Sequence, residues 1–292
     1  MKRVISFILV LLLMGSCIAL ADGSKDSRTV IGADLSAAEV ASVYGMFGIS
    51  QGDVKELTVT NADEREYLEG LVSDNLIGTR SISCIYIEVL DEGDGMNVSV
   101  KNISWCTPDM YMNAMVTAGI DDANVIVAAP FTVSGTAALT GIYKAYEDIT
   151  GKKLDPDAKQ VGTQELTTTA ELGDDIGDDN STAIVNELKL IIDEIAEMSD
   201  EELRQEIIDI AAKYDVELTD KQIQQLIDLC RAMEKLDLSQ LKDKVKQVQK
   251  YLKDITSSTE KIHNFFQNIG NSVSEVIDNI IGFFQRLFGS GS

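Results

Sequence analysis

Histidine and tryptophan are almost absent from this chain of 292 residues, which contains one of each. The histidine, His263, lies beside two phenylalanines near the C-terminus. A catalytic triad or a histidine-bound metal site needs that side chain among other reactive or ligating groups. We therefore predict no catalytic residues, no metal site and no cofactor. Paired carboxylates for glycoside hydrolysis exist in a chain this acidic, but a carbohydrate cleft normally presents several aromatic side chains, and Trp105 is the single tryptophan.

Basic residues are outnumbered: 25 lysines and arginines stand against 48 aspartates and glutamates, for a formal net charge of −23. A strongly negative surface repels nucleic acid and anionic lipid head groups. We therefore predict no nucleic-acid partner, and we interpret the acidity as a source of solubility that also favours cationic partners.

Cysteine is scarce, and no Cys-x-x-Cys pair occurs, which excludes the common zinc and thioredoxin-like motifs. We expect Cys84, Cys106 and Cys230 to be buried thiols. A disulfide between the first two would need a bulge or a shifted register, because a hairpin that turns at 91–95 sets Cys84 opposite Asn102.

The first 21 residues have the pattern of a secretory signal peptide. Lys2 and Arg3 precede an apolar run, and the small residues Ala19 and Ala21 are spaced as at a cleavage site. The run is too short to span a bilayer, which takes about 20 apolar residues. We predict cleavage after Ala21 and a protein that is exported, either extracellular or associated with the cell envelope.

A lipid anchor is the alternative for this segment. Met14-Gly15-Ser16-Cys17 is similar to a lipobox, in which Cys17 would be lipidated and become the first mature residue. Leucine is the usual residue where Met14 stands, so we favour cleavage after Ala21.

Residues 30–162 alternate between helix and strand signals. Ser36 and Glu39 form a capping box that opens a helix, and the glycine-rich stretch 91–95 is the strongest turn signal. The pattern predicts helices at 36–47, 61–72, 108–117 and 134–149, and strands at 54–60, 82–89, 98–105 and 125–129. The order from 54 to 129 is that of a split βαβ unit. We therefore predict an α+β fold with a four-stranded ferredoxin-like sheet, flanked by the first and last of these helices.

The chain turns polar at 163–180, where three threonines are followed by four aspartates and two glycines, and we predict an acidic linker there. Apolar residues at helical spacing then return in 184–195, 203–211, 223–233 and 241–252. We predict that 181–256 forms an all-α helical bundle.

The tail, 257–292, has an apolar, aromatic stripe at helical spacing. We predict an amphipathic helix that docks on the bundle, self-associates or lies in a membrane interface. Its polar face is not rich in lysine, which weakens the membrane interpretation. The candidate partner or membrane contacts are Phe265, Phe266, Phe283, Phe284 and Phe288.

Ser134, Gly135 and Thr136 follow a predicted strand and open a predicted helix. Backbone N–H groups and hydroxyls at the positive end of a helix can hold a carboxylate or phosphate. The alternative is that a hydroxyl only caps the helix and that Gly135 lets it pack. A second hypothesis concerns calcium, since Asp174, Asp175, Asp178, Asp179 and Asn180 offer oxygen ligands. Their spacing departs from that of an EF-hand loop, so a solvated linker is the other interpretation.

Four stretches resemble blocks of the YpuA-like family: IGADLS at 31–36, NLIGTRS at 75–81, YMNAMVTAGI at 111–120 and AAPFTVSGTAALTG at 128–141. Members of that family are exported proteins of Gram-positive bacteria, and their domain is classed as one of unknown function. The resemblance implies an envelope or extracellular setting and transfers no catalytic residue. Cys84 stands where the resemblance leads us to expect a small hydroxyl residue, so it implies no chemistry at that position.

The sequence as a whole favours a non-enzymatic exported protein that binds a protein or another component of the cell envelope, with self-association through the C-terminal helix as one form of that binding. The first alternative is a hydrolase or transferase acting on the cell wall, with its anion site at Ser134, Gly135 and Thr136 and a carboxylate as base. The second is a calcium-responsive module.

Overall fold

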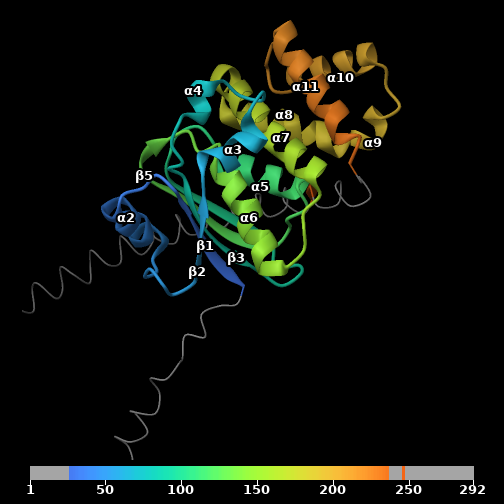
Figure 1. Ribbon diagram of the computed structural model, residues 1–292. Helices are drawn as coiled ribbons and strands as arrows, with labels where there is room; N and C mark the ends of the chain where they lie inside the picture. The colour runs from blue at the N-terminus through green and yellow to red at the C-terminus, as the bar shows by residue number, and fades with distance from the viewer. Residues whose placement is uncertain (1–25, 237–244, 247–292) are drawn as a thin grey trace, which may run out of the picture.

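A computed structural model describes residues 26–236 and 245–246 of the protein (Figure 1). The predicted signal peptide and the predicted aromatic tail helix lie outside the described residues. At the centre is a five-stranded mixed sheet in the order β2-β1-β3-β5-β4. Its strands are β1 (Ser27–Gly32), β2 (Lys55–Val59), β3 (Cys84–Val89), β4 (Met96–Ile103) and β5 (Ala123–Val133). A mixed sheet combined with many helices agrees with the predicted α+β class.

The ferredoxin-like arrangement is wrong. That fold would pair β3 with β4 as a hairpin, but β5 lies between them, antiparallel to β3 and parallel to β4. The predicted turn instead ties back to the start of β5, because the N–H groups of Gly93 and Gly95 both donate to Asp122 Oδ1. The chain thus passes from β3 to β4, which lies at the edge of the sheet beyond β5.

A strand that the sequence pattern did not reveal, β1, lies inside the sheet, parallel to β2 and antiparallel to β3. β1 lacks the apolar pattern of a buried strand because it begins with polar residues, and each of these has a partner in the fold. Thr29 Oγ1 shares a hydrogen bond with the Tyr44 hydroxyl, and Arg28 Nε donates to Asp148 Oδ2 at 2.6 Å.

Helices cover both faces of the sheet (Figure 1). α5 (Pro108–Thr117) and α6 (Ala138–Thr150) pack on one face, where the valines and isoleucines of β1, β3 and β5 form the main core. α2 (Ala37–Phe47) packs on the other face with Val43, Tyr44 and Phe47. Its predicted capping box between Ser36 and Glu39 is confirmed. Two shorter helices, α3 (Asn61–Leu68) and α4 (Asp74–Ile77), connect β2 to β3.

The predicted linker at 163–180 is also wrong. These residues belong to α7 (Pro156–Ile176) and α8 (Asp178–Leu190), separated by Gly177. The threonines are compatible with a buried helix because their hydroxyls bond to carbonyls of the preceding turn: Thr167 to Thr163 and Thr169 to Glu165. α7 lies close against α5, since a Cβ at Gly162 would stand 2.6 Å from the carbonyl oxygen of Ala114.

The described residues that follow α7 are helical, in agreement with the helical spacing of 184–195, 203–211 and 223–233. α8 is followed by α9 (Ile192–Ile195), α10 (Asp200–Ala212) and α11 (Asp220–Met233), and together with α7 they enclose a second core. Most of the fourth predicted segment, 241–252, lies outside the described residues. Among the described helices, none has the length and apolar character needed to cross a membrane.

A buried polar cluster joins the helical half to the sheet half. Lys189 of α8 is fully buried and donates to Glu165 Oε1 of α7 at 2.7 Å and to the carbonyl oxygen of Asn113 in α5 at 3.0 Å. Thr117 Oγ1 donates to the other oxygen of Glu165. Burial lowers the pKa of Lys189 and raises that of Glu165, and the attraction between the two charges opposes both shifts.

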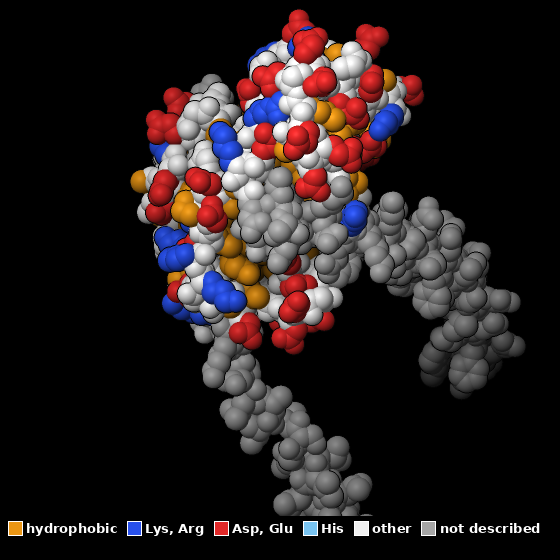
Figure 2. Space-filling model, turned by 90° about the vertical axis from the view of Figure 1, so that its right-hand side faces the viewer, with side chains coloured by type: hydrophobic (Ala, Val, Ile, Leu, Met, Phe, Trp, Pro, Cys, Tyr) orange, Lys and Arg blue, Asp and Glu red, His pale blue; other side chains and the backbone are white. Residues whose placement is uncertain are grey.

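Acidic side chains gather over the helical half, where α10 and α11 lie at the top of Figure 2. Those exposed in and around α10 include Asp193, Glu194, Glu197, Asp200, Glu201, Glu202 and Asp209. This part of the surface therefore accounts for much of the negative charge that Figure 2 displays.

Candidate functional site

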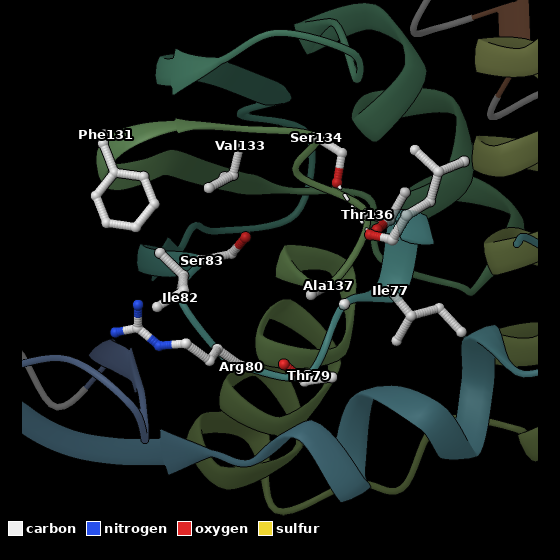
Figure 3. A pocket seen from close by; sticks show the side chains of 12 residues that line it. Ile77, Thr79, Arg80, Ile82, Ser83, Phe131, Val133, Ser134, Thr136 and Ala137 are labelled. Atoms are coloured by element: carbon white, nitrogen blue, oxygen red, sulfur yellow. Dashed lines mark hydrogen bonds between the residues drawn. The ribbon is translucent and has the colours of Figure 1, made fainter. Parts of the chain in front are cut away.

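A pocket of about 480 Å³ lies where the segment after α4 meets the end of β5 and the start of α6 (Figure 3). That volume is within the range of small-ligand sites. Its lining comes from residues 76–80, 82 and 83 on one side and from Phe131, Val133, Ser134, Thr136 and Ala137 on the other.

The wall formed by 78–83 is held by hydrogen bonds from several elements. Asn61 and Arg65 of α3 both donate to the carbonyl oxygen of Gly78. Asp34 and Ser81 bond to each other twice, through the Asp34 N–H to the Ser81 carbonyl and through the Ser81 N–H to Asp34 Oδ2. This wall is therefore in place before any ligand arrives.

Glu64 lies behind the same wall and is 1% exposed. Its Oε1 accepts the hydroxyl of Ser81 at 2.5 Å. Burial raises the pKa of Glu64 to about 7, against the lowering effect of the hydrogen bonds from Ser81 and Asn61. The carboxyl group therefore titrates near neutral pH.

The start of α6 forms the opposite wall. Gly135 is held by Tyr111, whose hydroxyl donates to the Gly135 carbonyl oxygen at 2.5 Å. A Cβ at Gly135 would stand 2.6 Å from that hydroxyl oxygen. Gly135 also has φ +99°, so both its backbone conformation and its surroundings require glycine.

Neither predicted capping residue caps α6. The N-cap is Ala137, and among the described residues no side chain caps the helix. The first helical N–H, that of Ala138, donates to the Gly135 carbonyl oxygen at 3.0 Å. Ser134 Oγ donates instead to the carbonyl oxygen of Leu76 at 3.4 Å. The positive end of α6 is therefore left without a side-chain partner, and it lies against the pocket.

Two further residues with hydroxyl groups belong to the lining, Thr136 and Ser83. Thr136 is 1% exposed and Ser83 is 9% exposed, yet neither hydroxyl oxygen is among the buried side-chain atoms that lack a hydrogen-bond partner in the described part of the chain. Figure 3 shows the hydroxyls of Ser134 and Thr136 at one end of the pocket, with Arg80 and Phe131 at the other.

Arg80 is the charged residue of the lining, which contains no carboxylate. One of its nitrogens, Nη2, donates to the carbonyl oxygen of Asp34 at 2.8 Å, which orients the guanidinium. Arg80 also helps to lower the pKa of Glu39, an exposed residue of α2. The pocket thus combines one cation, a helix start without a side-chain cap among the described residues, hydroxyl groups and apolar surface in a strongly acidic chain.

The model of the family described as "Protein of unknown function (DUF1002)" matches residues 31–251. The chain belongs to the DUF1002 family. It is 38% identical over 280 residues to the uncharacterized protein YpuA of Bacillus subtilis (strain 168), an alignment that covers 91% of this chain and 95% of that protein. The resemblance stated from the sequence blocks is thereby confirmed. No solved structure matches the chain.

Three of the blocks that carry the DUF1002 resemblance meet at the pocket. Residues 75–81 and 128–141 supply most of the lining, and 31–36 includes Asp34, which holds Ser81 and Arg80. Of the predicted anion-site residues, Ser134 and Thr136 line the pocket and Gly135 does not. Sequence reasoning missed Arg80, Phe131 and Ser83, although the first two lie within these blocks.

The pocket of this DUF1002 protein offers binding groups but no catalytic pair. Its hydroxyls have neither a histidine nor a carboxylate in the lining to act as base. Cys84 lies nearby, but it is 1% exposed, and burial raises its pKa to about 12. The expectation that the three cysteines are buried thiols is confirmed, since Cys84, Cys106 and Cys230 are all free and buried.

Two of the carboxylates predicted as calcium ligands have hydrogen-bond partners on other elements. Asp174 accepts a hydrogen bond from Trp105 Nε1, and Asp175 accepts one from Gln222 Nε2. Within residues 26–236 and 245–246, no group of three histidine, cysteine, aspartate or glutamate side chains could hold a metal ion. The geometry gives the calcium hypothesis no support. The candidate contacts Phe265, Phe266, Phe283, Phe284 and Phe288 lie outside the described residues.

Proposed function

We propose that this DUF1002 protein is an exported, non-enzymatic binding protein of the cell envelope. Its ligand carries an anionic group and an apolar part, and it binds in the pocket between β5, α6 and residues 76–83. The proposal joins the signal-peptide pattern of residues 1–21 to the chemistry of the pocket.

The observation that carries the proposal is the grouping of polar donors in one pocket. The hydroxyl residues Ser83, Ser134 and Thr136 belong to the lining, and among the described residues no side chain caps the start of α6. Helix starts are normally capped and favour negative charge, so an anionic group of a ligand would complete this one. The Arg80 guanidinium adds a charge of the right sign, and the lining presents no carboxylate to oppose it.

The second hypothesis from the sequence, a hydrolase or transferase, shares the anion site but needs a base. The lining contains none, so the pocket favours binding over turnover.

The test compares the affinities of the protein for a small carboxylic acid and for the corresponding uncharged amide. N-acetyl-leucine has a carboxylate and an apolar side chain, and N-acetyl-leucinamide differs only in lacking the charge. We expect the full chain to bind the acid at least tenfold more tightly in calorimetric titrations, and Arg80→Gln and Thr136→Val each to remove most of that preference, because charge-assisted hydrogen bonds are the strong ones.

Arg204→Gln is the matched control, since Arg204 lies on α10 and pairs with Asp220, and it should bind as the parent does. Equal affinity for the acid and the amide in the parent protein would contradict the proposal, as would an acid preference that survives both pocket substitutions.

A further inference from the structure

The buried carboxyl group of Glu64 is hydrogen-bonded to the segment that lines the pocket. Its Oε1 accepts the hydroxyl of Ser81 at 2.5 Å, and Ser81 is fully buried. Arg80 and Ile82, the neighbours of Ser81 in the chain, both belong to the lining, and Figure 3 shows them along the same side of the pocket. Ser81 therefore connects the buried carboxyl group to the pocket lining.

The same carboxyl group belongs to a network that holds the wall at two places. Its other oxygen, Oε2, accepts from Asn61 Nδ2 at 3.3 Å, and Asn61 also donates to the carbonyl oxygen of Gly78. Farther along, the Ser81 N–H donates to Asp34 Oδ2 at 2.8 Å. A change of charge at Glu64 therefore acts on the groups that hold the wall at Gly78 and at Ser81.

Negative and neutral groups surround Glu64. Burial is the largest cause that raises the pKa of Glu64 to about 7, and the negative charges of Asp34 and Asp63 raise it as well. Cys84 of β3 also interacts with Glu64, but burial raises the pKa of this thiol to about 12. The thiol is therefore uncharged where Glu64 titrates.

The cations of this region pair with other carboxylates. Arg65 of α3 pairs with Asp74 of α4, and Lys144 of α6 pairs with Asp63. Within the described part of the chain, none of the ion pairs includes Glu64. The ionised form of Glu64 thus has no counter-ion among these residues, and a further negative charge in the pocket would oppose it.

Resting on the proposed function, we propose that the anionic ligand binds together with a proton, which Glu64 takes from solvent and holds behind the wall. An anion at Arg80 and the start of α6 disfavours a second negative charge at Glu64, because charges interact strongly where protein excludes water. Coupling between two binding sites is reciprocal. The ligand therefore increases the proton affinity of Glu64, and the affinity for the ligand falls as Glu64 ionises.

The pH dependence of the affinity is the first test. N-acetyl-leucine stays ionised from pH 5.5 to 8.5, since an α-carboxyl group titrates near about 3.5. We expect the full chain to bind it at least fivefold more weakly at pH 8.5 than at pH 5.5, the effect over this range of a rise of about one unit in the pKa of Glu64 on binding. The uncharged N-acetyl-leucinamide should change by less than about twofold.

The proton taken up with the ligand can be measured directly. We would titrate N-acetyl-leucine at pH 7 in Bis-Tris and in Tris, two cationic buffers with different ionisation enthalpies, so that the difference in heat gives the number of protons bound. The same rise in pKa predicts an uptake of about 0.4 proton per ligand by the parent protein.

The variants assign the effect to one group. Glu64→Gln keeps an acceptor for the Ser81 hydroxyl and cannot ionise, so it should bind equally at both pH values and take up no proton. Ser81→Ala should shift the fall in affinity to higher pH, because the hydrogen bond from Ser81 lowers the pKa of Glu64. Glu66→Gln, at an exposed position of the same helix, is the control and should follow the parent.

Constant affinity across the pH range, no proton uptake by the parent, or unchanged uptake in Glu64→Gln would overturn the coupling. An equal loss for the amide at high pH would also contradict it, because charge on the ligand would then have no part in the effect. The titrations of the parent decide the question even if no variant folds. Failure of the parent to prefer N-acetyl-leucine over its amide at pH 5.5 overturns the proposed function itself, which separates the two results.

Discussion

At the scale of single residues, the clearest electrostatic feature is Glu64, a carboxyl group that is 1% exposed behind the pocket wall. Its pKa of about 7 in the folded protein lies well above the value near 4.3 expected for an unfolded chain. The folded state thus binds the proton more strongly than the unfolded state does. Stability from this group is complete below about pH 4 and is lost as the pH rises through 7.

We expect Glu64→Gln to remove this loss. The variant should be more stable than the parent at pH 8, by on the order of 3 kcal/mol, and close to it at pH 4.5, in urea denaturation followed across that range. Glu66→Gln, an exposed position on the same helix, is the control and should follow the parent. A difference between Glu64→Gln and the parent that does not change with pH would contradict the assignment.

Pocket residues also show what sequence reasoning can find. The position of Ser134 and Thr136 at the start of a helix was predicted, because a strand followed by a small hydroxyl-rich turn is a local pattern. Arg80 was not predicted as part of the site, because it reaches the pocket only through the long-range contact between residues 34 and 81. Local signals therefore identified one wall and could not identify the other.

At the scale of elements, α7 packs both against α5 on the sheet and against the helices that follow it. Its composition nevertheless resembles that of a linker. Its threonine hydroxyls are satisfied inside the helix, and Glu165 is paired with Lys189 of α8. A polarity pattern cannot distinguish solvated side chains from partnered ones. β1 was missed for the same reason, whereas α2 and α5, whose caps and apolar faces are local, were predicted within a residue or two.

The pair between α7 and α8 allows a direct test of this view. Lys189→Met leaves the Glu165 carboxylate buried without its partner, and Glu165→Leu does the same to the ammonium group. We expect each to lower the free energy of unfolding by about 3–5 kcal/mol. The double variant should recover most of that loss, since an apolar pair can replace a buried ion pair.

A double-mutant cycle from urea denaturation measures this coupling. The pair Lys213 and Glu187, whose lysine is exposed, is the control and should show coupling of at most about 1 kcal/mol. Additive losses at Lys189 and Glu165 would mean that the two charges do not depend on each other.

At the scale of the whole molecule, we propose that this acidic binding protein works outside the cytoplasm. The first residue of the mature protein tests whether it is exported and how. We expect cell fractionation to recover the chain in the wall or the medium, with Asp22 as the first residue by mass spectrometry. A lipidated Cys17 in the membrane fraction would replace cleavage by anchoring, and an intact Met1 in the cytoplasm would contradict export.

The strand order determines how early during synthesis the sheet can form. No two strands of this sheet form a hairpin, and the strand between β3 and β4 is β5, which is the last to emerge from synthesis. Every pairing must wait for a distant segment, and folds dominated by such contacts form slowly, in milliseconds to seconds. Until residues 123–133 have been synthesised, the strand that lies between β3 and β4 is missing and the five-stranded sheet cannot form. The strand order of this chain, which we propose is exported, therefore keeps the sheet incomplete until almost half of the chain has been made.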